Sequence, residues 1–126
     1  MTPDQPLDAH KPLDHEPQIN KFFRVAIKTL ANDIHLKVGQ PPKLRLQGIL
    51  KNTTGDALTA ERIEELVFEI LSPTQREFFM QNGTLDFAHE IGKEHRFRIN
   101  VFRQRGLISL VARRVSAHVP TFESLH

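Results

Sequence analysis

The 126-residue chain contains no cysteine, tryptophan or tyrosine. Without cysteine it cannot form disulfides, thiolate metal sites or a cysteine nucleophile, and it fits a reducing compartment. Aromatic packing is left to its nine phenylalanines. No apolar run is long enough to span a membrane, and the polar, acidic, proline-rich start does not resemble a signal peptide. We therefore expect one soluble domain with a real core.

The phosphate-cradling loops of nucleotide-binding proteins are missing as well. Neither Gly-x-x-x-x-Gly-Lys-Ser/Thr nor Gly-x-Gly-x-x-Gly occurs. This chain alone should therefore be inactive as an ATPase. Seven histidines suggest a metal site, but a zinc site needs three or four convergent ligands. No His-x-x-x-His lies on a predicted helix, and only His89 and His95 flank one turn, so we predict no metal.

Charge is distributed unevenly along the chain. Residues 1–20 carry four acids against one lysine, whereas residues 96–114 carry six arginines and no acid. This polarity favours anion binding by the basic segment. We interpret residues 1–18 as a disordered, acidic and proline-rich tail. Residues 19–118 form the predicted domain, and 119–126 the start of a linker.

Apolar periodicity gives the order of the elements. The predicted elements are a helix at about 19–30, strands at 33–38 and 43–47 (the second possible as far as 50), helices beginning at Thr59 and Ser72, a strand at 84–91, and a hairpin at 96–114. Ser72 is followed by proline and then glutamine, which forms a capping-box signature. Helices combined with an antiparallel sheet make this an α+β fold.

The hairpin at 96–114 is the most informative segment. Side chains alternate across a strand, so Phe97, Ile99 and Val101 share the apolar face. A turn with an even number of residues places Arg96, Arg98 and Arg113 together on the other face.

The register within this hairpin depends on the turn. A turn at residues 104–105 would set Arg96 opposite Arg113 and Arg98 opposite Val111, and an odd-length turn would break the alignment. Like charges that face each other across a sheet are unfavourable, so the cluster suggests an anionic partner. A solvated face whose arginines pair with acids elsewhere fits the pattern equally well.

Nucleic acid is a rival partner for this face. RNA-binding sheets expose two or three aromatic residues for base stacking. Here Phe97 lies with the aliphatic residues and Phe102 alone shares the arginine face, so nucleic acid is not the expected partner. Asp33 and His35 lie on one strand face, opposite the core, where a carboxylate could orient an imidazole. No serine or cysteine nucleophile accompanies them, and a surface hydrogen bond is the favoured interpretation.

Two stretches resemble a known family. Residues 31–48 read ANDIHLKVGQPPKLRLQG and residues 96–102 read RFRINVF. The family pattern is Ala-Ser-Asp-aliphatic-His-Leu, Gly-x-Pro-Pro and aliphatic-Arg-aliphatic, followed later by Arg-Phe-Arg-Val-Asn. Over residues 19–126 the chain resembles the PAS-like N-terminal domain of the PilT-type twitching-motility ATPases, in the secretion ATPase superfamily. Asn32 in place of serine and the acidic tail are departures.

The resemblance implies an antiparallel PAS-like sheet packed against helices, in the N-terminal domain of a homohexameric type IV pilus retraction ATPase. Such a domain packs on RecA-like cores of its own and neighbouring subunits. Carried over by motif, Arg98 and Arg113 would contact ATP phosphates and act in catalysis, with Arg96 as a further ATP contact.

The resemblance also implies that ATP and Mg²⁺ belong to a core absent from this chain, which would hold no cofactor alone. The implied location is cytoplasmic, at the inner-membrane pilus machinery and its platform proteins. One alternative is a stand-alone, non-catalytic module that docks on a pilus or secretion ATPase. A nucleic-acid-binding domain is the other alternative.

Overall fold

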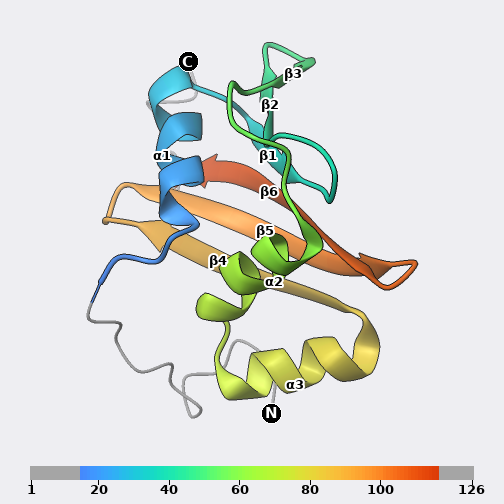
Figure 1. Cartoon of the computed structure of the whole chain (residues 1–126). Helices are drawn as coiled ribbons and strands as arrows, with labels where there is room; N and C mark the ends of the chain where they lie inside the picture. The colour runs from blue at the N-terminus through green and yellow to red at the C-terminus, as the bar shows by residue number, and fades with distance from the viewer. Residues whose placement is uncertain (1–14, 117–126) are drawn as a thin grey trace.

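The computed structural model describes residues 15–116 of the chain. The tail residues 1–14 and the end of the chain from residue 117 lie outside the described residues, so the predicted domain boundaries stay predictions. The elements are α1 (Asn20–Thr29), β1 (Asp33–Leu36), β2 (Lys43–Leu46), β3 (Ile49–Asn52), α2 (Ala60–Glu69), α3 (Pro73–Asn82), β4 (Thr84–Ile91), β5 (His95–Gln104) and β6 (Leu107–Ser116) (Figure 1).

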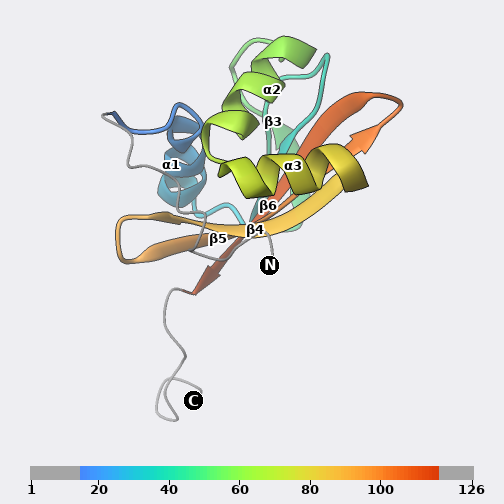
Figure 2. The same ribbon diagram turned by 90° about the horizontal axis from the view of Figure 1, so that it is seen from below.

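The strands form one antiparallel sheet in the order β3-β2-β1-β6-β5-β4. All three helices lie on the same side of this sheet, as the view from below shows (Figure 2). The opposite side carries no helix in the described part of the chain, so its side chains face outward. The α+β, PAS-like fold class predicted from the sequence is confirmed. None of the helices between residues 15 and 116 is long and apolar enough to cross a membrane.

The helix ends follow the capping chemistry in the sequence. Thr59 accepts a hydrogen bond from the Arg62 amide at the start of α2. Ser72 and Gln75 form a reciprocal capping box at the start of α3, and Gly83 ends that helix with a left-handed backbone. These caps satisfy backbone groups that a helix end leaves unpaired. The start of both helices is therefore fixed locally.

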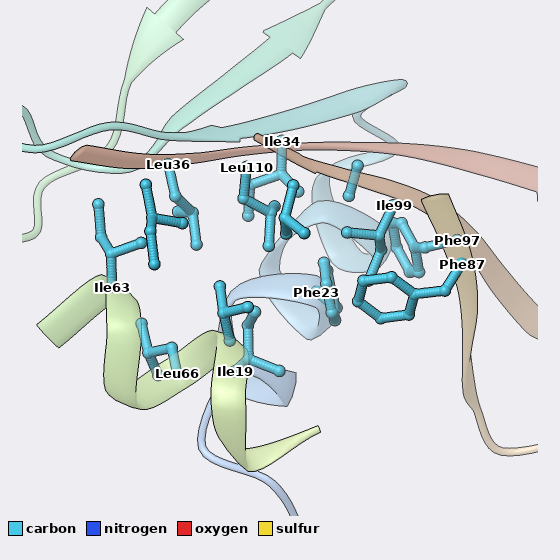
Figure 3. Packing of buried hydrophobic residues seen from close by; sticks show 14 of the residues in the cluster. Ile19, Phe23, Ile34, Leu36, Ile63, Leu66, Phe87, Phe97, Ile99 and Leu110 are labelled. Carbon is cyan, nitrogen blue, oxygen red and sulfur yellow. The ribbon is translucent and has the colours of Figure 1, made fainter. Parts of the chain in front are cut away.

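The core lies between the sheet and the helices (Figure 3). Phe23 of α1 stacks on Phe97 of β5, with ring centroids 4.6 Å apart and an interplanar angle of 23°. Ile34 and Leu36 of β1 are buried in the same cluster. The predicted placement of Phe97 on the core side is confirmed, because its side chain is fully buried.

Two hairpin turns differ from the prediction. The second predicted strand ends at Leu46, and Gln47 and Gly48 form a turn that leads into a third strand, β3, which the sequence analysis missed. Both turn residues have positive φ, 52° and 81°, as a type I′ turn requires. The alternation of Leu44, Leu46 and Leu50 resembled one continuous strand and so hid the turn, although the two-residue loop places Leu50 on the face of Arg45 and not on that of Leu44.

The arginine hairpin also turns one residue later than the turn at residues 104–105 that would set Arg98 opposite Val111. Gln104 pairs with Leu107, so Arg105 and Gly106 form the turn, with φ of 54° and 79°. Arg98 therefore lies opposite Arg113, and not opposite Val111. Glycine tolerates positive φ at no steric cost, which favours it at the second turn position. The loop still has an even number of residues, so the prediction that the three arginines share one face is correct.

His89 lies on the covered side of the sheet. Its Nε2 is 2.6 Å from Asn20 Oδ1 and its ring centroid 5.3 Å from that of Phe23. Because the amide oxygen can only accept, the imidazole donates this hydrogen bond. Burial lowers the pKa of His89 from its ordinary value, against a weaker opposing effect of Glu90. The partly buried imidazole is therefore neutral in the folded chain at neutral pH.

We expect stability to fall as the pH drops below about 6.5, the ordinary histidine pKa. Below that pH the unfolded chain takes up a proton at His89 that the folded chain still resists, so protonation favours unfolding. Urea unfolding at about pH 5.5 and 7.5 measures this difference. His89→Gln should reduce the loss of stability. A variant that keeps the full pH dependence would contradict the assignment to His89.

Replacing Phe97 by alanine should destabilise the domain by about 3–5 kcal/mol, the usual cost of removing a buried phenylalanine. Phe102→Ala is the matched control, because Phe102 lies on the uncovered face of the same strand and is half-buried. It should cost about 1 kcal/mol. Equal losses in urea unfolding would mean that the two faces do not differ as described.

Candidate functional site

A row of side chains crosses the uncovered face of the sheet, one from each of the four neighbouring strands β2, β1, β6 and β5. Strand pairing aligns Arg98 of β5 with Arg113 of β6, Arg113 with Asp33 of β1, and Asp33 with Arg45 of β2. We call these four residues the arginine row. Directly paired residues share a face, so all four side chains belong to the uncovered side. The row brings together two of the three predicted arginines and one predicted acid.

Asp33 is the centre of the row. Its side chain is only 8% exposed, and both of its oxygens accept hydrogen bonds from arginine. Arg45 Nε lies 3.1 Å from Oδ2, and Arg113 Nε lies 3.3 Å from Oδ1. Arg45 also donates to the Gly48 carbonyl at 3.2 Å, which ties it to the β2–β3 turn. Asp33 thus links β1, β2 and β6 through charged hydrogen bonds.

Arg98 and Arg113 remain available to a ligand. The Arg113 side chain is 73% exposed and uses only Nε toward Asp33, so its terminal nitrogens are free of partners within residues 15–116. The Arg98 side chain is exposed and makes no ion pair or hydrogen bond with another described residue. Three arginines against one carboxylate leave the row with an excess of positive charge. The arrangement suits an anion that could bridge two guanidinium groups.

Arg96 is on the same face but outside the row. It is exposed and lies between Glu90 of β4 and Val115 of β6 in the strand pairing. A carboxylate directly across the strand offsets its charge. Arg96 is therefore less suited to an anion than Arg98 or Arg113.

Asp33 and His35 share the uncovered face as predicted, but their contact is loose. His35 Nε2 lies 3.9 Å from Asp33 Oδ2, beyond hydrogen-bond distance. Burial lowers the pKa of His35; Asp33 opposes this effect, and Arg45 and Lys37 add to it. At this distance Asp33 does not orient His35 as a general base that could activate a nucleophile. Within the described residues no three histidine or acidic side chains are placed to hold a metal ion.

Sequence reasoning missed Arg45. Its link to Asp33 depends on the register between β1 and β2, where Asp33 pairs with Arg45. The available signal was the alternation on either side of the turn at residues 39–42. It shows which side chains share a face, but not which residues pair across the two strands.

Sequence reasoning also missed a hollow of about 660 Å³. It lies between α1, β2 and the loop before α2, where Phe22, Leu44 and Leu58 line it, and the buried Leu44 places it on the covered side of the sheet.

No model of a known protein family matches the chain. Among curated proteins it is 30% identical to the type IV pilus ATPase PilU of Pseudomonas aeruginosa, over 86% of this chain and 28% of that protein. It is also 30% identical to the type IV pilus retraction ATPase PilT of the same organism, over 85% of this chain and 31% of that protein. YggR of Escherichia coli, an uncharacterised protein, is 34% identical over 85% of this chain and 32% of its own length.

A solved structure agrees with these relatives. The crystal structure of the pilus retraction motor PilT with bound ADP superposes with a TM-score of 0.76 at 35% identity, over 86% of this chain and 32% of that one. The chain corresponds to the N-terminal domain of PilT-like pilus ATPases. It spans about a third of the length of these relatives. The Legionella pneumophila ATPase DotB, at 21% identity and a TM-score of 0.66, shares the fold.

In this PilT-like domain, Asp33→Ala should lower the free energy of unfolding by about 1–3 kcal/mol, because two charged hydrogen bonds are lost. Asp86→Ala is the matched control. Asp86 lies on the same face, is exposed, and among the described residues its side chain accepts only from Asn100 Nδ2, at 2.9 Å. Its loss should cost about 0.5 kcal/mol. Urea unfolding of both variants measures the difference, and equal losses would show that Asp33 does not link the strands.

Proposed function

We propose that this chain is the N-terminal domain of a hexameric pilus retraction-type ATPase, and that Arg98 and Arg113 contact the phosphates of ATP. The observation that carries the proposal is the direct pairing of Arg98 with Arg113 on the uncovered face. Asp33 holds Arg113 through Nε alone. Two guanidinium groups are thus presented side by side toward solvent.

The chemistry of guanidinium suits this role. It is always charged and offers several donors to phosphate oxygens. Opposed like charges on a sheet cost up to about 1 kcal/mol in the free domain. A bound polyphosphate offsets that repulsion between Arg98 and Arg113. Relief of the repulsion therefore adds to the free energy that favours binding of an anion. Cations placed there also stabilise charge on a transferring phosphoryl group.

ATP and Mg²⁺ would be held by a RecA-like core that carries the P-loop, because the chain has no such loop of its own. The domain would pack on the cores of its own and of a neighbouring subunit and present Arg98 and Arg113 at the nucleotide. Arg96 would be an outer ATP contact. The assembled motor would act in the cytoplasm on platform proteins of the pilus machinery in the inner membrane.

Arg98→Ala and Arg113→Ala, introduced into the protein that joins this domain to an ATPase core, should each lower ATP turnover about a thousandfold or more. Each variant should stay folded, since both side chains are exposed. Arg113→Ala also removes one of the two hydrogen bonds to Asp33, so it should lower the melting temperature slightly, whereas Arg98→Ala should not. Steady-state ATPase assays and circular dichroism melting measure the two effects.

Arg105→Asn is the control, because it removes the same charge at the hairpin turn, where asparagine tolerates the positive φ. It should leave turnover unchanged. If the Arg98 and Arg113 variants unfold, the two arginines are needed for the fold, and their loss of turnover says nothing about contact with ATP. Full activity of the folded variants would refute their contact with ATP.

A further inference from the structure

Asp33 is the one carboxylate of the arginine row, and it contacts only one of the two arginines that we expect at ATP. Arg113 Nε donates to Asp33 Oδ1 at 3.3 Å. Arg98, the direct cross-strand neighbour of Arg113, has no hydrogen-bond or ion-pair partner between residues 15 and 116. One guanidinium is therefore anchored to the sheet, and the other is not.

The Asp33 carboxylate is itself fixed in place. Its side chain is 8% exposed, and its second oxygen accepts from Arg45, which is tied in turn to the Gly48 carbonyl. Backbone hydrogen bonds hold the strand on both sides of it. The Asn32 amide donates to the Arg45 carbonyl, and the Arg114 amide donates to the Asn32 carbonyl, each at 2.9 Å. The position of the acceptor is therefore set by β1, β2 and β6 together.

This anchored acceptor acts on a long and exposed side chain. The Arg113 side chain is 73% exposed, and such a side chain loses rotamer freedom when a ligand fixes it. Because Asp33 accepts from Nε alone, it limits that freedom in advance and leaves both terminal nitrogens to donate to an anion. A donor that is already oriented stabilises developing negative charge without reorganising during the reaction.

The charge of Asp33 has the opposite effect on an anion. A carboxylate beside the arginines repels phosphate oxygens, so its charge alone weakens the binding of ATP. Replacing the carboxylate by an amide of the same size removes both effects at once. Loss of the anchor should lower turnover, whereas loss of the negative charge alone should leave turnover unchanged or raise it. The sign of the change therefore shows which effect is larger.

We propose that Asp33 is a positioning residue for ATP turnover: it holds Arg113 through Nε, so that the two terminal nitrogens of that guanidinium meet the phosphates of ATP. Asp33 itself does not touch the nucleotide. The inference rests on the proposed function, because it assigns to Asp33 a role in the contact between Arg113 and ATP.

Asp33→Asn, introduced into the protein that joins this domain to an ATPase core, should lower kcat about tenfold to a hundredfold, the scale of a misplaced catalytic contact. The amide has one acceptor oxygen in place of two, so it cannot hold both Arg45 and Arg113. KM for ATP should stay unchanged or fall, because a negative charge is lost. In the Arg113→Ala background the same substitution should change kcat by less than about twofold, since Asp33 acts through Arg113. Steady-state ATPase assays give kcat and KM, and circular dichroism verifies folding.

Asp86→Asn is the matched control. It removes the same charge from the same face of the sheet, on β4, where the side chain is exposed. It should leave kcat and KM unchanged in both backgrounds. A second measurement needs no substitution: in NMR spectra of the 126-residue chain, the Nε–H of Arg113 should exchange with water more slowly than that of Arg98.

Three results would refute the positioning role and leave the proposed function standing. An equal loss of kcat in the wild-type and Arg113→Ala backgrounds would mean that Asp33 supports only the fold. An unchanged or higher kcat in Asp33→Asn would mean that only its charge matters. Equal Nε–H exchange at Arg98 and Arg113 would mean that the anchor is absent, and this result holds even if Asp33→Asn does not fold. Full turnover of a folded Arg113→Ala variant would refute both the inference and the proposed function.

Discussion

A two-residue turn at Arg105 and Gly106 fixes which side chains meet across β5 and β6. Positive φ at both positions matches the right-handed twist of the strands and holds the register. That register places Arg98 opposite Arg113, and the pairing of β6 with β1 then places Asp33 beside Arg113. Displacing the turn by one residue toward the N-terminus would instead have set Val111 opposite Arg98. The composition of the candidate site is thus a consequence of turn geometry.

Asp33 makes the crowding of positive charge tolerable. A carboxylate shared by Arg45 and Arg113 offsets part of their mutual repulsion and holds both through Nε. It does not reach Arg98, which stays exposed and unpaired among the described residues. The row therefore keeps uncompensated positive charge at its β5 side. An anion bound there would gain attraction without displacing an existing ion pair.

The sequence predicted the parts of the site that depend on alternation. The period of two places Arg96, Arg98 and Arg113 on one face and Phe97 on the other, whatever the length of an even loop. Ser72 and Gln75 identify a helix start because capping is local. Pairing between strands is not local. The partner of Asp33 on β2 and the strand β3 both depend on turns whose φ angles the alternating pattern does not reveal, which is why Arg45 was missed.

The main stabilisation of the domain arises on the helix-covered face of the sheet, and the candidate binding site lies on the uncovered face. The stacked rings of Phe23 and Phe97 and the aliphatic cluster around them bury apolar surface on the helix-covered side, where the main stabilisation arises. Exposed arginines on the other side contribute little to that burial. Charge can therefore accumulate on the uncovered face without unfolding the domain. His35 is the exception, because it is mostly buried on this charged face and its Nε2 has no hydrogen-bond partner within residues 15–116. Leaving that nitrogen buried and unpaired has a cost, which the burial of apolar surface on the covered side of the sheet outweighs.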